Sequence, residues 1–143
     1  VVLDVAPQVH EGVRPYVLEN VLVETLDIDK MSGATYVADL FELDGVLEDA
    51  QFDFVVCTEV LEHVLSPFAA ISEVHRILKK GGMLFLSVPF NFRIHGPLPD
   101  CWRFTEHGLR ALLQSFAILE LNRIDTPERP LMPIHYTVVA AKA

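Results

Sequence analysis

The segment Phe52–Pro89, with the sequence FDFVVCTEVLEHVLSPFAAISEVHRILKKGGMLFLSVP, decides the fold of this chain. Its first part, Phe52–Cys57, is short, β-branched and aromatic, which is typical of a strand covered on both faces. Its last part, Met83–Val88, has the same character, and the residues between the two carry helix signals. The segment therefore predicts a strand, a helix and a second strand, the repeating unit of an α/β sheet.

The helix predicted inside this segment has recognisable ends and one apolar face. Ser66 can cap the free N–H groups of its first turn, and Pro67 suits the first helical position. Gly81 can adopt the left-handed conformation that ends a helix. The residues expected to face the core recur every three or four positions: Phe68, Ile71, Val74 and Leu78.

The same alternation of strands and helices continues outside this segment. Further strands are expected at Val1–Val5, Val21–Ile28, Tyr36–Ala38, Ala117–Asn122 and Ile134–Ala140. A short helix is expected within Gly12–Asn20, and Thr105 caps a second amphipathic helix with Leu109, Leu112, Leu113 and Phe116 inward. The last two strands are joined by a loop rather than a helix, which predicts an antiparallel pair. The sequence thus predicts one α/β domain, a Rossmann-like doubly wound sheet that is mostly parallel, with an antiparallel last strand and helices on both faces.

Composition excludes several classes of protein. The net charge is −9, and the 14 acidic and 2 basic residues through Ile71 concentrate it in the N-terminal half. Nucleic-acid binding proteins usually carry a basic stripe, and this chain has none, so we expect no nucleic-acid partner. No stretch approaches the run of about 20 apolar residues that a membrane span needs. Cys57 and Cys101 are expected to be buried or half-buried thiols, which suits a cytoplasmic protein.

Carboxylates gather where the predicted strands end. In open α/β sheets, ligands bind at the carboxyl ends of the strands, near the point where strand order reverses. These ends are Asp4–Gln8, Asp27–Asp29, Ala38–Leu40, Cys57–His63 and Val88–Phe90, and four of the five carry an Asp or a Glu. The sequence therefore predicts a ligand with cationic or hydroxyl groups at this edge.

Three segments together resemble a known family. They are VVLDV at the start, ETLDID at the end of the second strand, and the segment Phe52–Pro89 with its L-E-H turn, its R-x-L-K-x-G-G helix end and its strand ending in Pro. This combination resembles the class I S-adenosylmethionine-dependent methyltransferases, and the resemblance covers nearly the whole chain. It implies a seven-stranded sheet with S-adenosylmethionine across the first strand ends, in a domain spanning residues 1–143 that lacks the helices the family carries before the first strand.

The resemblance assigns cofactor-binding roles position by position. Asp4 lies where the family's acidic residue holds the amino-acid end of the cofactor. Asp27, 23 residues later, matches the carboxylate that takes the ribose hydroxyls. The remaining positions are Ala6 and Gly12 in the loop after the first strand, Ala38, Asp39 and Leu40 beside the adenine, and Thr58 and Glu59 beside the methionine portion.

The loop after the first strand departs from the family pattern. The family usually shows D-x-G-x-G-x-G there, whereas Ala6, Gln8 and His10 occupy the three glycine positions of this chain. Ala6 adds only one methyl group, but Gln8 and His10 would crowd a standard turn. Either the loop is rebuilt, with Gly12 supplying the flexible point before the helix, or cofactor affinity is lost. We expect the rebuilt loop, because the other strand ends keep their expected residues.

Two histidines are candidate general bases. Methyl transfer from a sulfonium is an in-line displacement, which needs a base only when the acceptor is a protonated group such as a hydroxyl. His63, next to Glu62 at the end of a strand, is the first candidate, and its alternative role is to orient the turn that follows. His95 is the second candidate. No C-x-x-C or H-x-x-x-H spacing is present, so the sequence predicts no metal site.

The irregular segment Pro89–Phe104 is expected to face the methyl acceptor, because so long a loop inside a compact domain is usually functional. Its candidate contacts with a small acceptor molecule are Arg93, Asp100, Trp102 and Arg103. Trp102 and Phe104 have a second possible role, in which they dock the loop onto the core while Arg103 pairs with a carboxylate.

The sequence thus predicts methyl transfer from S-adenosylmethionine to a small polar acceptor such as a sugar. The alternative is a catalytically silent module that kept the fold and lost the cofactor. A Rossmann-type dehydrogenase is a weaker alternative, because the G-x-G-x-x-G turn it needs is absent.

Overall fold

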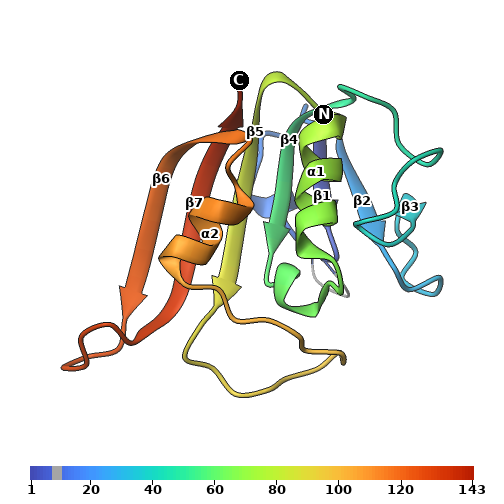
Figure 1. Ribbon diagram of the computed structural model, residues 1–143. Coiled ribbons are helices and arrows are strands. Elements are labelled where there is room, and N and C mark those ends of the chain that lie inside the picture. The colour runs from blue at the N-terminus through green and yellow to red at the C-terminus, as the bar shows by residue number, and fades with distance from the viewer. Residues whose placement is uncertain (8–10) are drawn as a thin grey trace.

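The computed structural model describes residues 1–7 and 11–143, which form one seven-stranded sheet with helices packed on it (Figure 1). The strands are β1 (Val2–Val5), β2 (Val23–Asp27), β3 (Tyr36–Val37), β4 (Phe52–Thr58), β5 (Leu78–Pro89), β6 (Phe116–Asp125) and β7 (Pro133–Lys142). The α-helices are α1 (Pro67–Ile77) and α2 (Glu106–Leu112), and the short 3-10 helices are η1 (Arg14–Tyr16) and η2 (Leu61–His63).

The sheet has the strand order β3-β2-β1-β4-β5-β7-β6. The first five strands pair in parallel, whereas β7 lies antiparallel between β5 and β6. This arrangement confirms the mostly parallel sheet and the antiparallel terminal pair predicted from the sequence. Chain order reverses beside β1, which lies between β2 and β4, so the carboxyl ends of these three strands form the edge where such sheets bind ligands.

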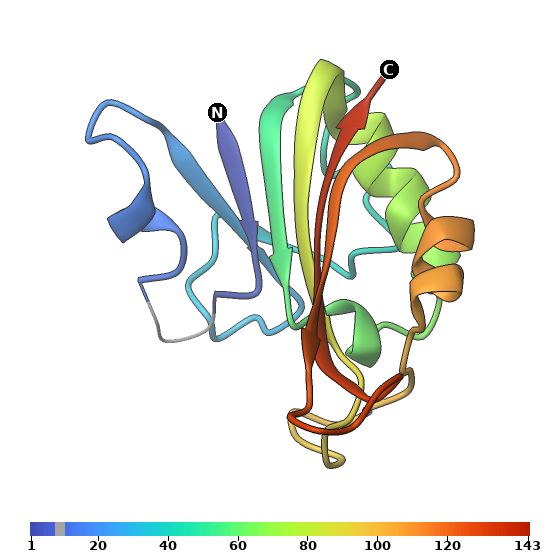
Figure 2. The ribbon, with the colours of Figure 1, turned by 90° about the vertical axis from the view of Figure 1, so that its left-hand side faces the viewer.

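The two faces of the sheet are covered differently. In Figure 2 both α-helices lie on one face, and among residues 1–7 and 11–143 the opposite face is covered by the segment that contains η1. The described part of Gly12–Asn20 thus forms a three-residue 3-10 turn rather than the longer helix expected there. The prediction that Phe52–Cys57 is covered on both faces is wrong, because Phe54 is 38% exposed and packs against Phe85 on the less covered face.

Helix α1 packs an apolar face on the sheet, but two of its details differ from the prediction. The buried residues are Pro67, Ala70, Ile71, Val74 and Ile77, whereas Phe68 is 62% exposed. Pro67 takes the first turn as expected, but the Ser66 side chain makes no capping hydrogen bond. The core thus uses the small Ala70 where the sequence pattern suggested Phe68.

The helix also ends earlier than predicted. It stops at Ile77, and β5 begins at Leu78 and includes Lys79–Gly82. Gly81 has the left-handed φ expected of it (+76°), but it lies within a strand next to a register shift between β4 and β5. Helix α2 follows its prediction: the Thr105 side chain accepts a hydrogen bond from the Gly108 N–H, and Leu109, Leu112 and Leu113 are buried.

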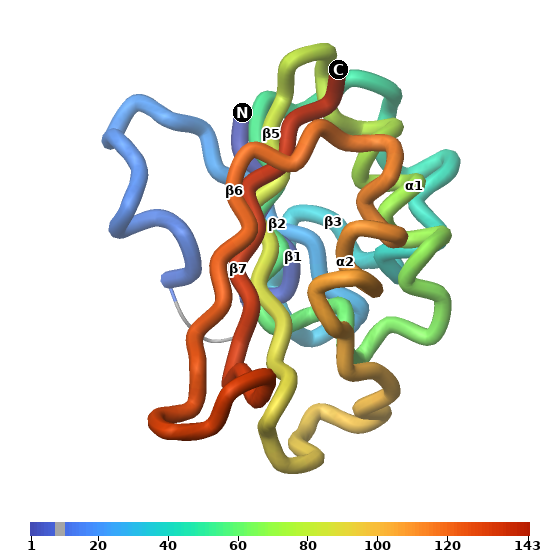
Figure 3. Tube along the Cα trace, turned by 60° about the vertical axis from the view of Figure 1, so that its left-hand side comes forward, coloured from blue at the N-terminus to red at the C-terminus, as the bar shows by residue number. Residues whose placement is uncertain are grey.

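The connection from β5 to α2 projects beyond the carboxyl ends of the strands, which the tube in Figure 3 shows at the lower edge of the molecule. Residues 90–105 connect these two elements and contain most of the segment predicted to face the methyl acceptor, so we call them the acceptor loop. Both cysteines are free thiols, but Cys101 on this loop is exposed rather than buried or half-buried. Within residues 1–7 and 11–143, no helix combines the length and apolar character needed to cross a membrane.

Candidate functional site

A pocket of about 380 Å³ opens at the carboxyl ends of β1 and β4, where the sequence predicted the cofactor. The residues that line it are Asp4, Ala6, Pro7, Gly12, Val13, Tyr16, Val56, Thr58 and Glu59. Five of the nine predicted cofactor-binding residues are in this set. The structure thus brings together Asp4, Ala6, Gly12, Thr58 and Glu59, which are separated by up to 55 positions in the sequence.

Asp4 is the buried carboxylate of this pocket. Its side-chain Oδ2 accepts a hydrogen bond of 2.8 Å from the Val13 N–H, so one oxygen is used to position the loop that follows β1. Burial raises the pKa of Asp4, and the hydrogen bond from Val13 opposes this effect. Asp4 therefore organises the loop as well as contributing charge to the pocket.

Gly12 packs directly on that carboxylate. Its φ is +61°, and a Cβ atom placed on it would overlap Asp4 Oδ2 and lie 2.8 Å from Pro7 Cβ. Only glycine can occupy this position without moving the acidic residue.

Ala6 also has the backbone conformation of a glycine. Its φ is +52°, and its N–H donates a 2.7 Å hydrogen bond to the carbonyl of Leu26 on the neighbouring strand. The alanine thus affects this loop through backbone conformation, more than through the volume of its methyl group. Gln8 and His10, the other two departures from the glycine pattern, lie outside the described residues.

The remaining cofactor candidates lie one or two strands away and do not line this pocket. Asp27 is the last residue of β2, and the residue is 8% exposed. Its Oδ1 accepts a 2.9 Å hydrogen bond from the Asp29 N–H. The Ala38 N–H donates a hydrogen bond to the Asp27 backbone carbonyl, which places Ala38 at the end of β2. Leu40 is buried in the core. Their contacts with a cofactor stay predictions.

The two candidate bases meet around a buried carboxylate. The rings of His63 and His95 lie edge to face, with centroids 4.8 Å apart. The Nε2 atom of each faces Glu62 Oε1, at 3.7 Å from His63 and 3.5 Å from His95. Glu62 is fully buried, and neither of its carboxylate oxygens has a hydrogen-bond partner in the described part of the chain. Burial raises the pKa of Glu62. We call these three residues the Glu62 cluster.

The acceptor loop is tied to the fold by the residues expected to touch the acceptor. Arg103 makes a two-pronged ion pair with Asp100, with nitrogen–oxygen distances of 2.6 and 3.0 Å. The Arg103 guanidinium holds the pKa of Asp100 well below its usual range. Trp102 Nε1–H donates to the Val64 carbonyl at 2.8 Å, and Phe104 is buried. These contacts support the docking role for Trp102, Arg103 and Phe104.

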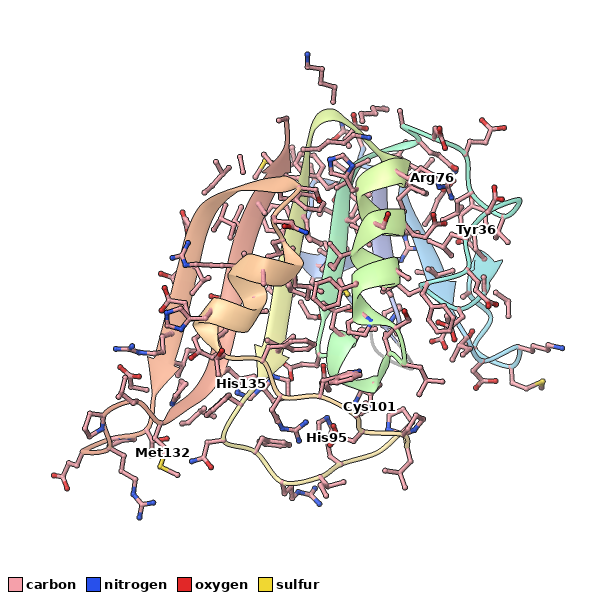
Figure 4. The ribbon with its side chains drawn as sticks, in the orientation of Figure 1. Tyr36, Arg76, His95, Cys101, Met132 and His135 are labelled. Atoms are coloured by element: carbon pink, nitrogen blue, oxygen red, sulfur yellow. The ribbon has the colours of Figure 1, made fainter. Side chains whose placement is uncertain are left out.

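Arg93 differs from the other loop candidates, because its side chain is exposed and has no ion pair among the described residues. It is the one predicted acceptor contact whose charge is not already used within the loop. Figure 4 shows His95 and Cys101 on this loop, below the ends of the strands, with His135 close to the end of β5.

Sequence reasoning missed His135, which connects the pocket to the loop. Its Nε2 lies 3.1 Å from Glu59 Oε2, while the Ser87 hydroxyl donates to Glu59 Oε1 at 2.9 Å. The Phe92 ring packs edge to face on both His135 and His95. Glu59 has a φ of +55°, a strained conformation that often marks functional positions. Because Glu59 and His135 are 76 residues apart, only the order of the strands could have indicated their contact.

Comparisons with known proteins agree with this geometry. A family model described as a methyltransferase domain matches residues 9–86, more than half of the chain. The ubiquinone biosynthesis O-methyltransferase of Pseudomonas paraeruginosa (strain DSM 24068 / PA7) is 54% identical over 37 residues, which are 26% of this chain and 16% of the relative. The matched part of the chain thus spans under one fifth of that relative's length.

Solved structures show the same fold over the full chain. A methyltransferase from Methanosarcina mazei has a TM-score of 0.75 at 20% identity, and the match covers 99% of this chain and 91% of the Methanosarcina chain. The Burkholderia thailandensis 1,6-didemethyltoxoflavin-N1-methyltransferase, solved with S-adenosylhomocysteine, has a TM-score of 0.70 at 20% identity. The match covers 99% of this chain and 70% of the Burkholderia chain. With its family match, its strand order and its acidic strand ends, this chain belongs to the class I S-adenosylmethionine-dependent methyltransferases.

Proposed function

We propose that this domain binds S-adenosylmethionine across the ends of β1, β2 and β4 and transfers its methyl group to a hydroxyl of a small polar acceptor. The observation that carries the proposal is the pocket beside Asp4. At Gly12 the backbone lies so close to the Asp4 carboxylate that a side chain there would overlap it. A buried carboxylate next to close backbone suits a ligand with an ammonium group and hydroxyls better than it suits the phosphates of a nucleotide cofactor.

The residues of the chain divide into three groups in this proposal. Asp4 and Gly12 form the part of the pocket that takes the amino-acid end, and Asp27 accepts hydrogen bonds from the ribose hydroxyls. Thr58 and Glu59 line the side nearest the acceptor loop. When bound, S-adenosylmethionine supplies an electrophilic methyl group on its sulfonium. The protein then has to align the acceptor and exclude water.

The acceptor is proposed to be a hydroxyl compound because two histidines lie at the acceptor side. Neutral imidazole removes a proton from an oxygen nucleophile as the methyl group is transferred, and an acceptor without such a proton needs no base. His63 and His95 each have a ring nitrogen not used in a hydrogen bond to the backbone or to Asp100. The named O-methyltransferase activity of the Pseudomonas relative favours oxygen as the accepting atom. Arg93 suits an acceptor with an anionic group, and a sugar acid or a similar small metabolite meets both conditions.

The competing function is a silent module that keeps the fold without the cofactor. The alanine at position 6 and the free thiols, which suit a reducing cytoplasm, are compatible with both functions. Calorimetric titration with S-adenosylmethionine and S-adenosylhomocysteine separates them. Binding of both in the micromolar range supports the enzyme, whereas no heat up to millimolar ligand refutes cofactor binding and favours the silent module.

Asp27→Asn tests the proposed ribose contact. The amide oxygen can still accept the hydrogen bond from the Asp29 N–H, so the turn after β2 is kept, but the charge that strengthens bonds to two hydroxyls is lost. We expect the affinity for S-adenosylhomocysteine to fall roughly 10- to 100-fold, the loss of a charge-assisted hydrogen bond. The matched control is Asp44→Asn, an exposed residue in the connection between β3 and β4. Equal affinity of the Asp27 variant and the wild type would remove Asp27 from the site.

A further inference from the structure

The Glu62 cluster brings three side chains with potential metal-ligand atoms close together. Glu62 Oε1 lies 3.7 Å from His63 Nε2 and 3.5 Å from His95 Nε2, which is too long for a hydrogen bond in either case. All three candidate ligand atoms lie within 4.8 Å of one another. The carboxylate is fully buried, and both of its oxygens lack a hydrogen-bond partner among residues 1–7 and 11–143.

The opposite nitrogen of each histidine is held by an acceptor. His63 Nδ1 lies 2.8 Å from the Pro99 carbonyl, and His95 Nδ1 lies 3.3 Å from both Asp100 Oδ2 and the Arg93 carbonyl. Carbonyl and carboxylate oxygens only accept, so each Nδ1 carries the ring proton and donates it. In the neutral ring, each Nε2 then has a lone pair facing Glu62. Metal-binding histidines are oriented in this way, with the second ring nitrogen bonded to a carbonyl or a carboxylate.

Arg103 on the acceptor loop makes no ion pair with Glu62, because its guanidinium is used elsewhere. Arg103 is engaged by both oxygens of Asp100 and by the carbonyls of Phe92, Arg93 and Trp102. An ionised carboxylate buried without a partner is strongly unfavourable, so a cation or a proton has to complete the site.

We propose that Glu62, His63 and His95 bind a divalent transition-metal ion of the Zn²⁺, Fe²⁺ or Co²⁺ class. Ligand bonds of about 2.0–2.1 Å give ligand–ligand separations of roughly 3.3 Å in a tetrahedral site, a few tenths of an ångström below the separations from Glu62 to the two histidines. Two imidazole nitrogens and one carboxylate suit these ions, whereas Mg²⁺ and Ca²⁺ take mainly oxygen ligands. Three protein ligands leave a coordination position for water or a substrate oxygen, as in catalytic rather than structural sites.

The site would change how the acceptor is activated. An ion that uses both Nε2 lone pairs prevents His63 and His95 from acting as bases, and instead lowers the pKa of an oxygen bound to it. This consequence rests on the proposed methyl transfer, but the metal site itself does not. Direct metal binding, measured without methyl donor or acceptor, therefore tests the inference independently of the proposed function.

The experiment titrates the metal-free chain, prepared by chelation, with Co²⁺ and with Zn²⁺. We expect one equivalent to bind, with visible d–d absorption of the Co²⁺ form and displacement of Co²⁺ by Zn²⁺. His95→Gln and Glu62→Gln are expected to weaken Co²⁺ binding at least 100-fold. Asp100→Asn, which removes the negative charge behind His95 Nδ1, should weaken Co²⁺ binding about 10- to 100-fold.

The controls separate this site from adventitious binding. Cys101→Ser removes an exposed thiol whose backbone N–H bonds to the Glu62 carbonyl, and His107→Gln removes an exposed histidine on α2; both should bind Co²⁺ as the wild type does. Circular dichroism confirms that each variant is folded. No Co²⁺ or Zn²⁺ uptake by the folded wild type overturns the proposal and assigns a proton to Glu62. Co²⁺ binding by the His95→Gln variant that equals that of the wild type also overturns the proposal, and so does a loss of Co²⁺ binding in the Cys101→Ser variant.

Discussion

At the scale of the residue, Ala6 stands in a conformation that usually belongs to glycine. Its φ of +52° places the Cβ against its own backbone, at a cost of about 1–2 kcal/mol for residues other than glycine. Ala6→Gly relieves this strain but adds freedom to the unfolded chain, which offsets part of the gain. We expect the free energy of unfolding to rise by about 0.5–1 kcal/mol in urea titrations.

The control for this substitution is Ala111→Gly, on the exposed face of α2. There the backbone is helical and glycine is unfavourable, so the free energy of unfolding should fall by about 1 kcal/mol. A rise in the free energy of unfolding for Ala6→Gly and a fall for Ala111→Gly would confirm that Ala6 has the left-handed conformation. A lower free energy of unfolding for Ala6→Gly would show that Ala6 has a negative φ and that the loop after β1 has another conformation.

Single residues also show where sequence reasoning stops. Asp4 and Gly12 could be placed from the sequence, since the family resemblance put Asp4 at the end of the first strand and left Gly12 as the flexible point of the loop that follows. The burial of Glu62 could not, because it is a charged residue in a short polar turn, and η2 turns it inward beneath the acceptor loop. Its contact with His95 joins residues separated by 33 positions, through a loop without periodicity.

At the scale of the element, Arg76 fastens helix α1 to the connection between β3 and β4. Its guanidinium binds both oxygens of Glu73 at 2.9–3.0 Å, Asp49 Oδ1 at 2.7 Å and the Leu47 carbonyl at 2.9 Å. Lysine keeps the charge but cannot form this planar fork. Arg76→Lys should therefore lower the free energy of unfolding by about 1–2 kcal/mol, measured by urea unfolding.

Arg110 provides the matched comparison. It pairs with Glu106 four residues earlier on the exposed side of α2, and such surface pairs contribute about 0.3–0.5 kcal/mol. Arg110→Lys should leave the unfolding midpoint almost unchanged. If the two substitutions had equal effects, the Arg76 network would be no more than a surface ion pair.

Elements were predicted best where local signals agree with packing. The strand β4, the parallel order and the capped helix α2 follow from apolar runs and from Thr105. The end of α1 was misplaced, because Gly81 fits a helix end and a strand bulge equally well in isolation. Because Leu78 pairs with Phe52, β5 begins before Gly81. A cross-strand contact, which a local pattern does not contain, thus set that boundary.

At the scale of the whole molecule, acid should unfold the protein through carboxylates held ionised by arginines. Arg76 lowers the pKa of Glu73, and Arg103 lowers that of Asp100. Because their pKa values are lower in the folded state, the unfolded chain binds protons first as the pH falls. The stability they contribute is complete above their unfolded values of 4.5 and 3.8 and is lost as the pH falls through the folded ones.

Asp4 acts in the opposite direction, because burial raises its pKa in the folded state. Protonation of Asp4 as the pH falls toward its unfolded value of 3.8 adds stability, whereas the stability from Glu73 and Asp100 is lost below 4.5 and 3.8. The predicted curve of unfolding free energy against pH is therefore flat or slightly rising down to about pH 4.5 and falls at lower pH. Urea unfolding at intervals from pH 7 to pH 3 measures this curve. Glu73→Gln removes one of the titrating groups and should make the acid limb shallower, whereas Glu106→Gln, on the exposed face of α2, should leave its slope unchanged. A wild-type curve that keeps rising down to pH 3 would mean that buried carboxylates, rather than the arginine-paired ones at α1 and the acceptor loop, govern the acid stability of the fold.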